Sequence, residues 1–257
     1  MNNERHRYRV SRSWDAVADW YNGWSGPQGS RHHRTLAIPL AMELLQLRPG
    51  ERVVDLGCGP GAMAPAAARA GATLVGVDSS QKLIATARLH HRSAEFLLAD
   101  VTQLPALPAL APGSFDAALF LLSIQDIDPL GAAIATSARL LKPGGRLALV
   151  MLHPCFRVPR QSGWGWDDSR SLQFRRLDSY LSPLAVPMQQ YGGKHVGTTR
   201  SYHRPLGTYV EALAAAGLTV TAIREVPGMV SRGSSRAERR AAQEFPLLLG
   251  LSARLAR

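Results

Sequence analysis

Residues 53–62 read VVDLGCGPGA, and this stretch decides the fold. It begins with an apolar run and continues through Gly57, Gly59 and Gly61 into an alanine-rich segment. Glycines adopt positive φ freely and let a ligand approach the backbone closely, and the first N–H groups of a helix bind polar or anionic groups. The stretch therefore predicts a buried strand, a ligand-binding loop and the start of a helix.

Apolar runs and helical segments alternate downstream of this stretch. We expect strands at 53–56, 74–77, 95–98, 115–122 and 146–152, and helices at 62–70, 81–89 and 130–141. Strands separated by helices at this spacing indicate a parallel sheet with helices on both faces. The expected fold class is α/β, a doubly wound and mostly parallel sheet.

The length of 257 residues fits a single domain with four parts. Lid helices are expected at 13–47 and a cofactor-binding core at 51–152. An inserted cap, rich in aromatic residues and glycine, follows at 153–204, and a C-terminal part at 205–257. Within the last part we expect a helix at 206–216 and a strand at 218–226. A polar, Arg-rich connection at 229–243 and a final strand at 245–255 follow.

The charge is strongly uneven along the chain. Residues 1–138 hold 12 basic and 12 acidic residues, whereas residues 139–257 hold 18 basic and 7 acidic, so the net charge of +11 lies in the second half. Such a surface attracts nucleic acid or an anionic substrate. Because the arginines are scattered, a solvated surface is favoured, and a nucleic-acid partner is not expected.

Targeting and redox signals are weak. No apolar run reaches 18 residues, so we expect no transmembrane helix. The N-terminus, MNNERHRYRV, lacks the apolar core of a signal peptide. The two cysteines, Cys58 and Cys155, are too few for a disulfide framework. We therefore expect a cytoplasmic protein.

Carboxylates follow the second and third expected strands. Asp78 stands 17 residues after Gly61 and is followed by Ser79, and a carboxylate at that strand tip can accept hydrogen bonds from both ribose hydroxyls of a nucleoside. Asp100 closes the next strand unit, where it can reach an adenine amine. The alternative for Asp100 is a cap on the following turn.

Five segments together resemble the class I S-adenosylmethionine-dependent methyltransferases. They are VVDLGCGPG, GVDSS, LLADV, FDAALF and LKPGGRL, in the order of that family. The resemblance covers about 45–152 well and 205–255 more loosely. It implies a Rossmann-like sheet of seven strands in the order 3-2-1-4-5-7-6 with an antiparallel seventh strand. It also implies S-adenosylmethionine as cofactor and methyl transfer to a small-molecule acceptor.

Two alternatives compete with this interpretation. An RNA or protein methyltransferase would use the basic second half of the chain. An NAD-dependent dehydrogenase would explain Gly57, Gly59 and Asp78, but neither Asp100 nor LKPGG.

The resemblance also implies roles for individual residues. It places Asp55, Gly57, Cys58, Gly59 and Gly61 around the methionine moiety of the cofactor, and Asp78 and Ser79 at the ribose. It places Asp100 and Val101 beside the adenine, and Phe120 and Leu121 near the sulfonium. Tyr21 belongs to a lid segment over the carboxylate end of the cofactor, and Arg34 is the basic group expected to meet that carboxylate. The alternative for the 29–34 segment is a surface turn.

Three residues are candidates for catalysis. Many small-molecule members carry a His pair after the fourth strand, where this chain has Ser-Ile-Gln-Asp at 123–126. Asp126 either orients an acceptor amine or hydroxyl or caps the next helix. His153 ends the fifth strand and His203 lies where the cap rejoins the core. Histidine suits general-base chemistry, and the neighbouring Arg204 favours a neutral His203 as base. The alternative for each histidine is a structural hydrogen bond.

The cap supplies candidate substrate contacts. Trp164 and Trp166 alternate with glycines, and Arg204 belongs to a group of arginines around them. We expect this segment to cover an aromatic or carboxylate-bearing acceptor. The alternative is a structural cap or an arm of a homodimer. No residue spacing indicates a metal site.

Overall fold

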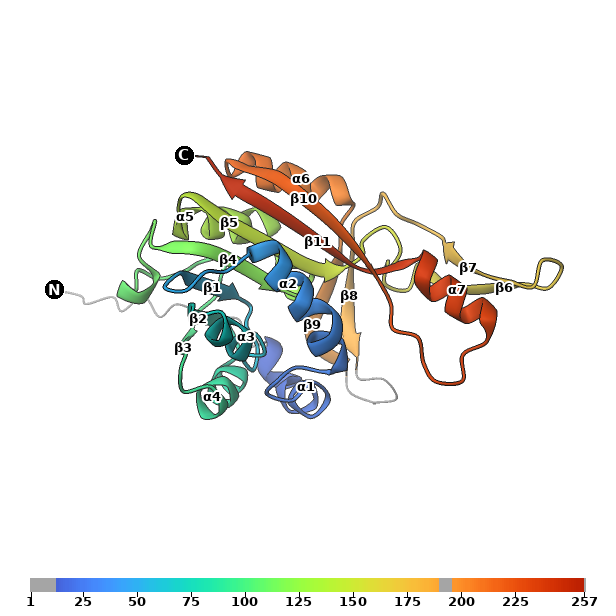
Figure 1. The fold of residues 1–257 in the computed structure, drawn as a ribbon, viewed down its shortest axis with the longest axis horizontal. Helices are drawn as coiled ribbons and strands as arrows, with labels where there is room; N and C mark the ends of the chain where they lie inside the picture. The colour runs from blue at the N-terminus through green and yellow to red at the C-terminus, as the bar shows by residue number, and fades with distance from the viewer. Residues whose placement is uncertain (1–12, 190–195, 257) are drawn as a thin grey trace.

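A seven-stranded sheet organises the protein (Figure 1). The computed structural model describes residues 13–189 and 196–256. The sheet order is β10-β11-β5-β4-β1-β2-β3. The strands are β1 (Arg52–Leu56), β2 (Thr73–Asp78), β3 (Glu95–Leu98), β4 (Phe115–Leu121), β5 (Leu141–Leu152), β10 (Leu218–Pro227) and β11 (Pro246–Leu255). With β10 and β11 as sixth and seventh strands, the predicted fold class and strand order are confirmed.

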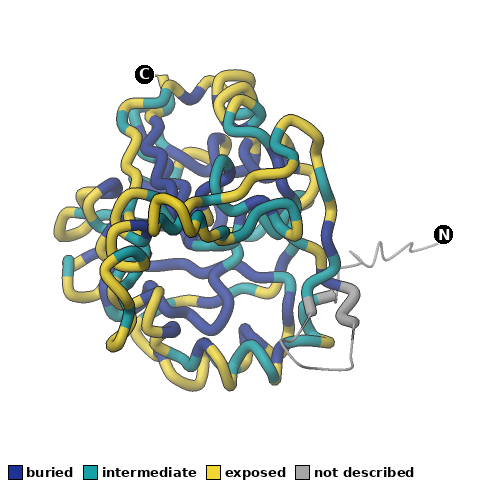
Figure 2. The backbone as a smooth tube through the Cα atoms, turned by 90° about the vertical axis from the view of Figure 1, so that its right-hand side faces the viewer, coloured by how far each residue is buried: buried dark blue, intermediate teal, exposed yellow. Residues whose placement is uncertain are grey.

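Strand direction follows the expected pattern. Strands β1 to β5 pair in parallel, and Val54 of β1 lies between Val75 of β2 and Ala118 of β4. Strand β11 pairs antiparallel with both β5 and β10. The parallel strands are continuous apolar runs because helices cover both of their faces. Figure 2 shows these central strands as the buried part of the chain.

Each face of the sheet has its own helices. Helices α5 (Leu130–Leu140) and α6 (Leu206–Ala215) pack on one face. On the other face lie α2 (Ile38–Leu45), α3 (Ala64–Arg69) and α4 (Gln81–His90). Helix α2 approaches β11 so closely that a Cβ on Gly250 would come within 2.7 Å of Leu44 Cδ1. Helix α1 (Ala18–Ser25) contacts α4.

The 153–204 segment is not one cap, and this corrects the sequence analysis. It forms two antiparallel hairpins, β6 (Ser162–Asp167) with β7 (Leu172–Leu177), and β8 (Leu184–Gln189) with β9 (Val196–His203). Strand β9 contacts the turns Ser13–Ala16 and Ile124–Asp126 of the core. The β6–β7 hairpin instead extends away from the sheet (Figure 1).

Helix α7 (Arg236–Glu244) replaces the expected polar connection. Ser235 accepts a hydrogen bond from the Glu238 N–H, and the Glu238 side chain accepts one from the Ser235 N–H. This capping box fixes the start of a helix. Helix α7 packs against β7, and we call β6, β7 and α7 the projecting lobe.

No helix in the described ranges is both long and apolar enough to cross a membrane.

Candidate active site

A cavity of about 630 Å³ opens where β1, β2 and β4 end. Its walls come from the glycine loop after β1, the ends of β2 and β4, helix α1 and the β8–β9 hairpin. Ten predicted site residues line it: Tyr21, Gly57, Cys58, Gly59, Asp78, Ser79, Asp100, Val101, Leu121 and Asp126. The carboxyl edge of a parallel sheet is the expected place for a ligand in this fold.

The glycine loop has no room for side chains at its first position. Gly57 has φ 76°, and a Cβ there would lie 2.6 Å from the Ser123 Cβ. The Ser123 hydroxyl donates to the Leu56 carbonyl at 2.7 Å, which ties the end of β4 to the end of β1. Gly59 also has positive φ, and the Tyr21 ring lies 3.7 Å from the position of its absent Cβ. Tyr21 therefore covers the loop.

Asp78 joins the loop to the end of β2. Its Oδ2 accepts a hydrogen bond from the Gly59 N–H at 2.8 Å, and its Oδ1 accepts one from the Ser80 N–H at 2.8 Å. A carboxylate has about four lone-pair sites, so it can also accept from a ligand in the cavity. Burial raises the pKa of Asp78, and backbone hydrogen bonds from Ser80, Gly59 and Ser79 oppose that rise.

Asp100 caps the turn that follows it, which was the alternative given for this residue, and it also lines the cavity. Its Oδ1 accepts hydrogen bonds from the Thr102 N–H at 2.9 Å and the Thr102 hydroxyl at 2.7 Å. These bonds cap the turn after β3 and leave Oδ2 for a ligand. Val101 beside it lines the cavity as well.

Four predicted cofactor residues do not line the cavity. Phe120 has 0% exposure and packs in the core below β4. A Cβ on Gly61 would come within 2.8 Å of His91, so this glycine serves close packing. The Arg34 guanidinium donates to the Gly29 carbonyl instead of reaching toward a ligand. Asp55 is buried beneath the glycine loop with 1% exposure.

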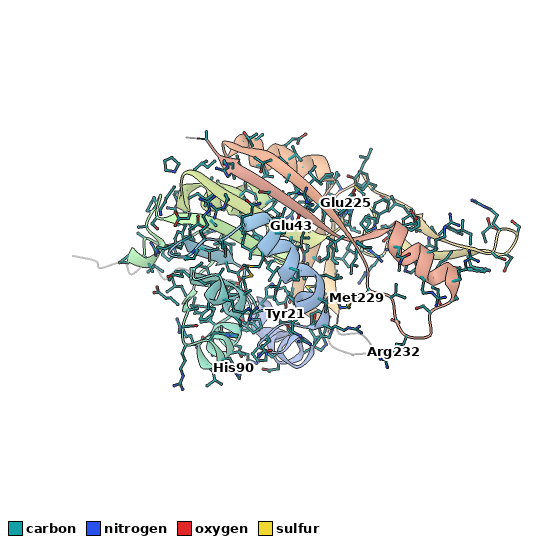
Figure 3. The ribbon with its side chains drawn as sticks, in the orientation of Figure 1. Tyr21, Glu43, His90, Glu225, Met229 and Arg232 are labelled. Atoms are coloured by element: carbon teal, nitrogen blue, oxygen red, sulfur yellow. The ribbon has the colours of Figure 1, made fainter. Side chains whose placement is uncertain are left out.

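His153 does not line the cavity, and its contacts match the alternative of a structural hydrogen bond. Its side chain is 2% exposed, and Nε2 lies 2.7 Å from Glu225 Oε1. Its Nδ1 accepts a hydrogen bond from the Cys155 N–H at 3.2 Å. Both ring nitrogens are engaged, away from the cavity. Figure 3 places Glu225 on β10, far from Tyr21 on α1. Burial lowers the pKa of His153, and Glu225 opposes this effect.

His203 and Arg204 are not among the residues that line the cavity. The His203 Nε2 donates to the Tyr180 carbonyl at 2.6 Å, and the side chain is buried. Arg204 donates to the Ile127 carbonyl at 2.8 Å and pairs with Asp128 at 2.9 Å, and both of these partners line the cavity. Buried polar groups require partners, and these contacts match the alternative of a structural hydrogen bond given for His203. The roles of His203 as base and Arg204 as substrate contact stay predictions.

Trp164 and Trp166 belong to the projecting lobe and do not line the cavity, so this structure does not bring them to the expected acceptor position. Trp166 is 51% exposed, and its Nε1 donates to Asp168 at 2.9 Å. The Trp164 ring lies between the guanidinium groups of Arg157 and Arg175, at 5.5 and 5.1 Å from its centroid. These cation–π contacts hold the lobe together.

Asp126 is the catalytic candidate that the structure places in the cavity. It lies in the turn after β4 and receives hydrogen bonds from Ser201 and Gln125. Its Oδ1 is enclosed and has no hydrogen-bond partner among the described residues, and the same holds for Gln125 Oε1. Burial raises the pKa of Asp126 to about 7.

Several lining residues escaped the sequence analysis. Most of them are apolar or aromatic, and one is an arginine: Trp14, Trp24, Met188, Tyr202, Leu247, Leu248 and Arg200. His33 also lines it; the Ser30 N–H donates to its Nδ1 at 3.2 Å, and burial lowers its pKa to about 4. This imidazole is neutral at physiological pH. The amphipathic aromatic pattern at 13–24 was the available signal for Trp14 and Trp24.

Comparisons with known proteins agree with this geometry. A family model described as a methyltransferase domain matches residues 54–149. The ubiquinone biosynthesis O-methyltransferase of Xanthomonas campestris pv. campestris (strain B100) is 36% identical over 149 residues, which cover 56% of this chain and 57% of that protein. The demethylmenaquinone methyltransferase of Beutenbergia cavernae is 31% identical over 144 residues, which cover 56% of this chain and 55% of that one. The chain thus spans little more than half the length of these curated relatives.

A solved structure extends the likeness to nearly the whole chain. An S-adenosylmethionine-dependent methyltransferase from Mesorhizobium loti superimposes with a TM-score of 0.68 at 27% identity, covering 89% of this chain and 100% of that one. Residues 54–149 are thus a methyltransferase domain, and the chain around them is similar to class I S-adenosylmethionine-dependent methyltransferases. The matched segment runs from β1 to β5, the strands that build one side of the cavity.

The acidic residues around the cavity fit S-adenosylmethionine, the cofactor of the methyltransferases that the chain resembles. S-adenosylmethionine carries a sulfonium cation, an ammonium group and two ribose hydroxyls. Asp55 has an enclosed Oδ1 without a hydrogen-bond partner in the described part of the chain, and burial together with Asp78 raises its pKa to about 8. A cationic ligand beside such a pair stabilises the ionised carboxylates. In the described residues, no three His, Cys, Asp or Glu side chains are grouped to hold a metal ion.

Proposed function

We propose that this protein transfers a methyl group from S-adenosylmethionine to a small-molecule acceptor. The observation that carries the proposal is the mixed lining of the cavity. It combines the glycine loop, Asp78 and Asp100 with apolar and aromatic residues and Arg200, and we assign this second set to an acceptor half. A single cavity that offers polar groups for a nucleoside and an apolar space beside them fits a cofactor next to an organic acceptor.

In this proposal the cofactor is held at the ends of β1, β2 and β3. Asp78 binds the ribose, and Asp100 and Val101 flank the adenine. Gly57, Gly59 and Cys58 form the floor for the methionine moiety, with Asp55 supplying negative charge from below. When bound, the cofactor supplies an electrophilic sulfonium methyl group.

The remaining lining residues position the acceptor and exclude water. Tyr21 and Trp24 lie on α1, and their rings are 5.8 Å apart. Opposite them, Met188 and Tyr202 contribute from the β8–β9 hairpin. Alignment of the acceptor with the sulfonium methyl supplies much of the rate enhancement in such a transfer, and a closed aromatic wall maintains that alignment.

An RNA or protein methyltransferase is the second candidate, favoured by the net charge of +11. Arginines of the projecting lobe, such as Arg170, Arg176 and Arg239, lie outside the cavity lining. For this reason a small acceptor is preferred to a polymer. We also propose a cytoplasmic location. For a homodimer, we propose the lobe as the contact surface, because its exposed Trp166 and Phe174 offer an apolar contact.

Calorimetry with S-adenosylhomocysteine tests the cofactor site. Asp78→Ala removes hydrogen bonds to a charged group, and we expect the affinity to fall by about 2 kcal/mol or more, roughly 30-fold. Asp168→Ala, on the exposed turn of the projecting lobe, is the matched control and should bind like the wild type. Equal affinity of wild type and Asp78→Ala would contradict the assignment, and no binding by the wild type would contradict the proposed function.

A further inference from the structure

Asp126 is held in a way that suits a proton-donating ligand. It is the first acidic side chain after β4 and lines the cavity. Ser201 from β9 and Gln125 beside it donate to its carboxylate, while Oδ1 has no hydrogen-bond partner in the described part of the protein. A buried carboxylate oxygen without a partner is costly. A ligand O–H or N–H directed at Oδ1 removes that cost.

The Asp126 carboxylate lies near a residue that covers the glycine loop. Tyr21 covers Gly59 of the glycine loop, and the charge of Asp126 is among the causes that raise the pKa of the Tyr21 phenol, after burial. Asp126 is thus near Tyr21, on the side where β9 closes the cavity. A group at that place faces an acceptor whose reacting atom points toward the cofactor.

We propose that Asp126 accepts the proton of the methyl acceptor, and that the acceptor is an aromatic hydroxyl. This inference rests on the proposed function. In the reaction the acceptor oxygen forms a bond to the methyl carbon while the bond from that carbon to sulfur breaks. The bonding pair stays with sulfur, which becomes a neutral thioether, and the hydroxyl proton passes to the Asp126 carboxylate. Charge and atoms balance without a further reactant.

The chemistry of the surroundings selects a phenol over an aliphatic alcohol. Trp24, Met188 and Tyr202 line the acceptor half and accommodate a planar ring. Burial raises the pKa of Asp126 to about 7, which brings it closer to the value of about 10 typical of a phenol. Proton transfer in the transition state is most effective when donor and acceptor are matched in this way.

Charged and titratable groups surround Asp126. Arg204, which follows β9, lowers the pKa of Asp126, and Tyr209 of α6 and Tyr21 of α1 are both affected by its charge. Asp128 in the same turn pairs with Arg204. The tyrosines have raised pKa values, so two carboxyl groups of the site titrate near neutrality, Asp126 at about 7 and Asp55 at about 8. Replacement of Asp126 alone separates their effects.

A binding experiment tests the inference without turnover. Protein saturated with S-adenosylhomocysteine is titrated with two matched pairs, 4-methylphenol against 4-methylanisole and 2-naphthol against 2-methoxynaphthalene. At pH 8, where Asp126 is mostly ionised and both hydroxyl compounds keep their protons, we expect the wild type to prefer each hydroxyl compound at least tenfold. Asp126→Leu, which has no oxygen, should lose the preference, whereas Asp168→Leu should keep it. Equal affinity within both pairs, or no binding of either hydroxyl compound, overturns the inference.

Kinetics separate a proton acceptor from a structural residue. With radiolabelled cofactor and a panel of phenols, amines and thiols, we expect methylation of phenols and a rise of kcat/KM with pH through about 7, the pKa of Asp126. Asp126→Asn should lower kcat about 10²–10⁴-fold and remove this dependence, and Asp126→Glu should restore part of both. Ser201→Ala should move the midpoint upward, because a hydrogen bond to the ionised form is lost.

The outcomes distinguish this inference from the proposed function. Transfer to amines or thiols alone, or an unchanged pH profile in Asp126→Asn that still binds S-adenosylhomocysteine, overturns the role of Asp126 and leaves methyl transfer in place. Failure of the wild type to bind S-adenosylhomocysteine would remove the proposed function instead.

Discussion

The two hairpins inserted after β5 differ in what they bury. The β8–β9 hairpin carries Val186, Thr199 and His203, each at most 8% exposed, and it closes the cavity. No residue of β6 or β7 is buried, and both strands lie in the projecting lobe (Figures 1 and 2). The comparison shows that a single aromatic and glycine-rich insertion can form two different structures. Its first hairpin is a surface element, and its second hairpin is a wall of the cavity.

The β8–β9 hairpin also affects the pKa of Asp126, which it covers. Ser201 and Arg204 approach Asp126 from this side, yet burial outweighs their effect and the pKa of Asp126 rises from its usual value to about 7. Asp167 on the other hairpin shows the opposite direction. Its pKa is lowered by hydrogen bonds from Ser169 and Arg170 in an exposed turn.

The largest expected difference concerns stability against pH. A carboxyl group with a raised pKa in the folded state stabilises the fold while it is protonated, and this contribution is lost as pH rises toward the folded value. For Asp126, with a folded pKa of about 7, the loss between pH 5 and pH 8 amounts to about 3 kcal/mol at 1.36 kcal/mol per pH unit. Asp55, with a folded pKa of about 8, adds a loss of the same sign.

Urea unfolding at pH 5 and pH 8 measures this difference. Asp126→Asn should lose less free energy of unfolding over that interval than the wild type, by about 3 kcal/mol. Asp168→Asn on the lobe should follow the wild type. Identical losses in all three proteins would show that Asp126 is ionised across the whole range.

The next effect concerns the acceptor wall. The Tyr202 ring lines the cavity and lies under the Arg204 guanidinium, 4.9 Å from its centroid. Truncation in Tyr202→Ala removes apolar contact with the acceptor and admits water, so we expect kcat/KM to fall about tenfold or more, since burial of a large side chain contributes about 1.5–3 kcal/mol. Affinity for S-adenosylhomocysteine should change less than threefold. Tyr202→Phe keeps the ring and is the control; a similar loss in both variants would assign the effect to the hydroxyl.

Sequence reasoning was strongest where local pattern and burial agree. The strands β1 to β5 followed from apolar runs, because a parallel strand buried on both faces has a distinctive composition, whereas the order of the sheet was implied by the resemblance to the methyltransferase family. The lining positions of Gly57, Gly59, Asp78 and Asp100 followed from their place at strand ends. Helix α7 was missed although Ser235 and Glu238 form a capping box, since the polar composition of the segment resembled a loop.

Side-chain direction was the part that the sequence did not determine. His153 and His203 stand at the chain positions expected for a base, and both point to structural partners, Glu225 and the Tyr180 carbonyl. These partners lie 72 and 23 residues away along the chain. A long-range pairing of this kind leaves no periodic signal in the sequence. Asp126 differs because its place is fixed locally, at the end of β4.

The smallest effect on stability and turnover is expected for a change in the lobe. It differs from the expectation that the tryptophans of the lobe contact the acceptor. Trp166 is 51% exposed and donates to Asp168 in the same turn. An exposed side chain with one local hydrogen bond contributes little, so Trp166→Ala should change the free energy of unfolding by less than about 0.5 kcal/mol. Turnover and cofactor affinity should both stay within about twofold of the wild type, in contrast to Tyr202→Ala. A large loss of turnover in Trp166→Ala, with an unchanged oligomeric state in sedimentation velocity, would mean that the projecting lobe folds back over the cavity during the reaction, and the distinction drawn between the two hairpins would then be wrong.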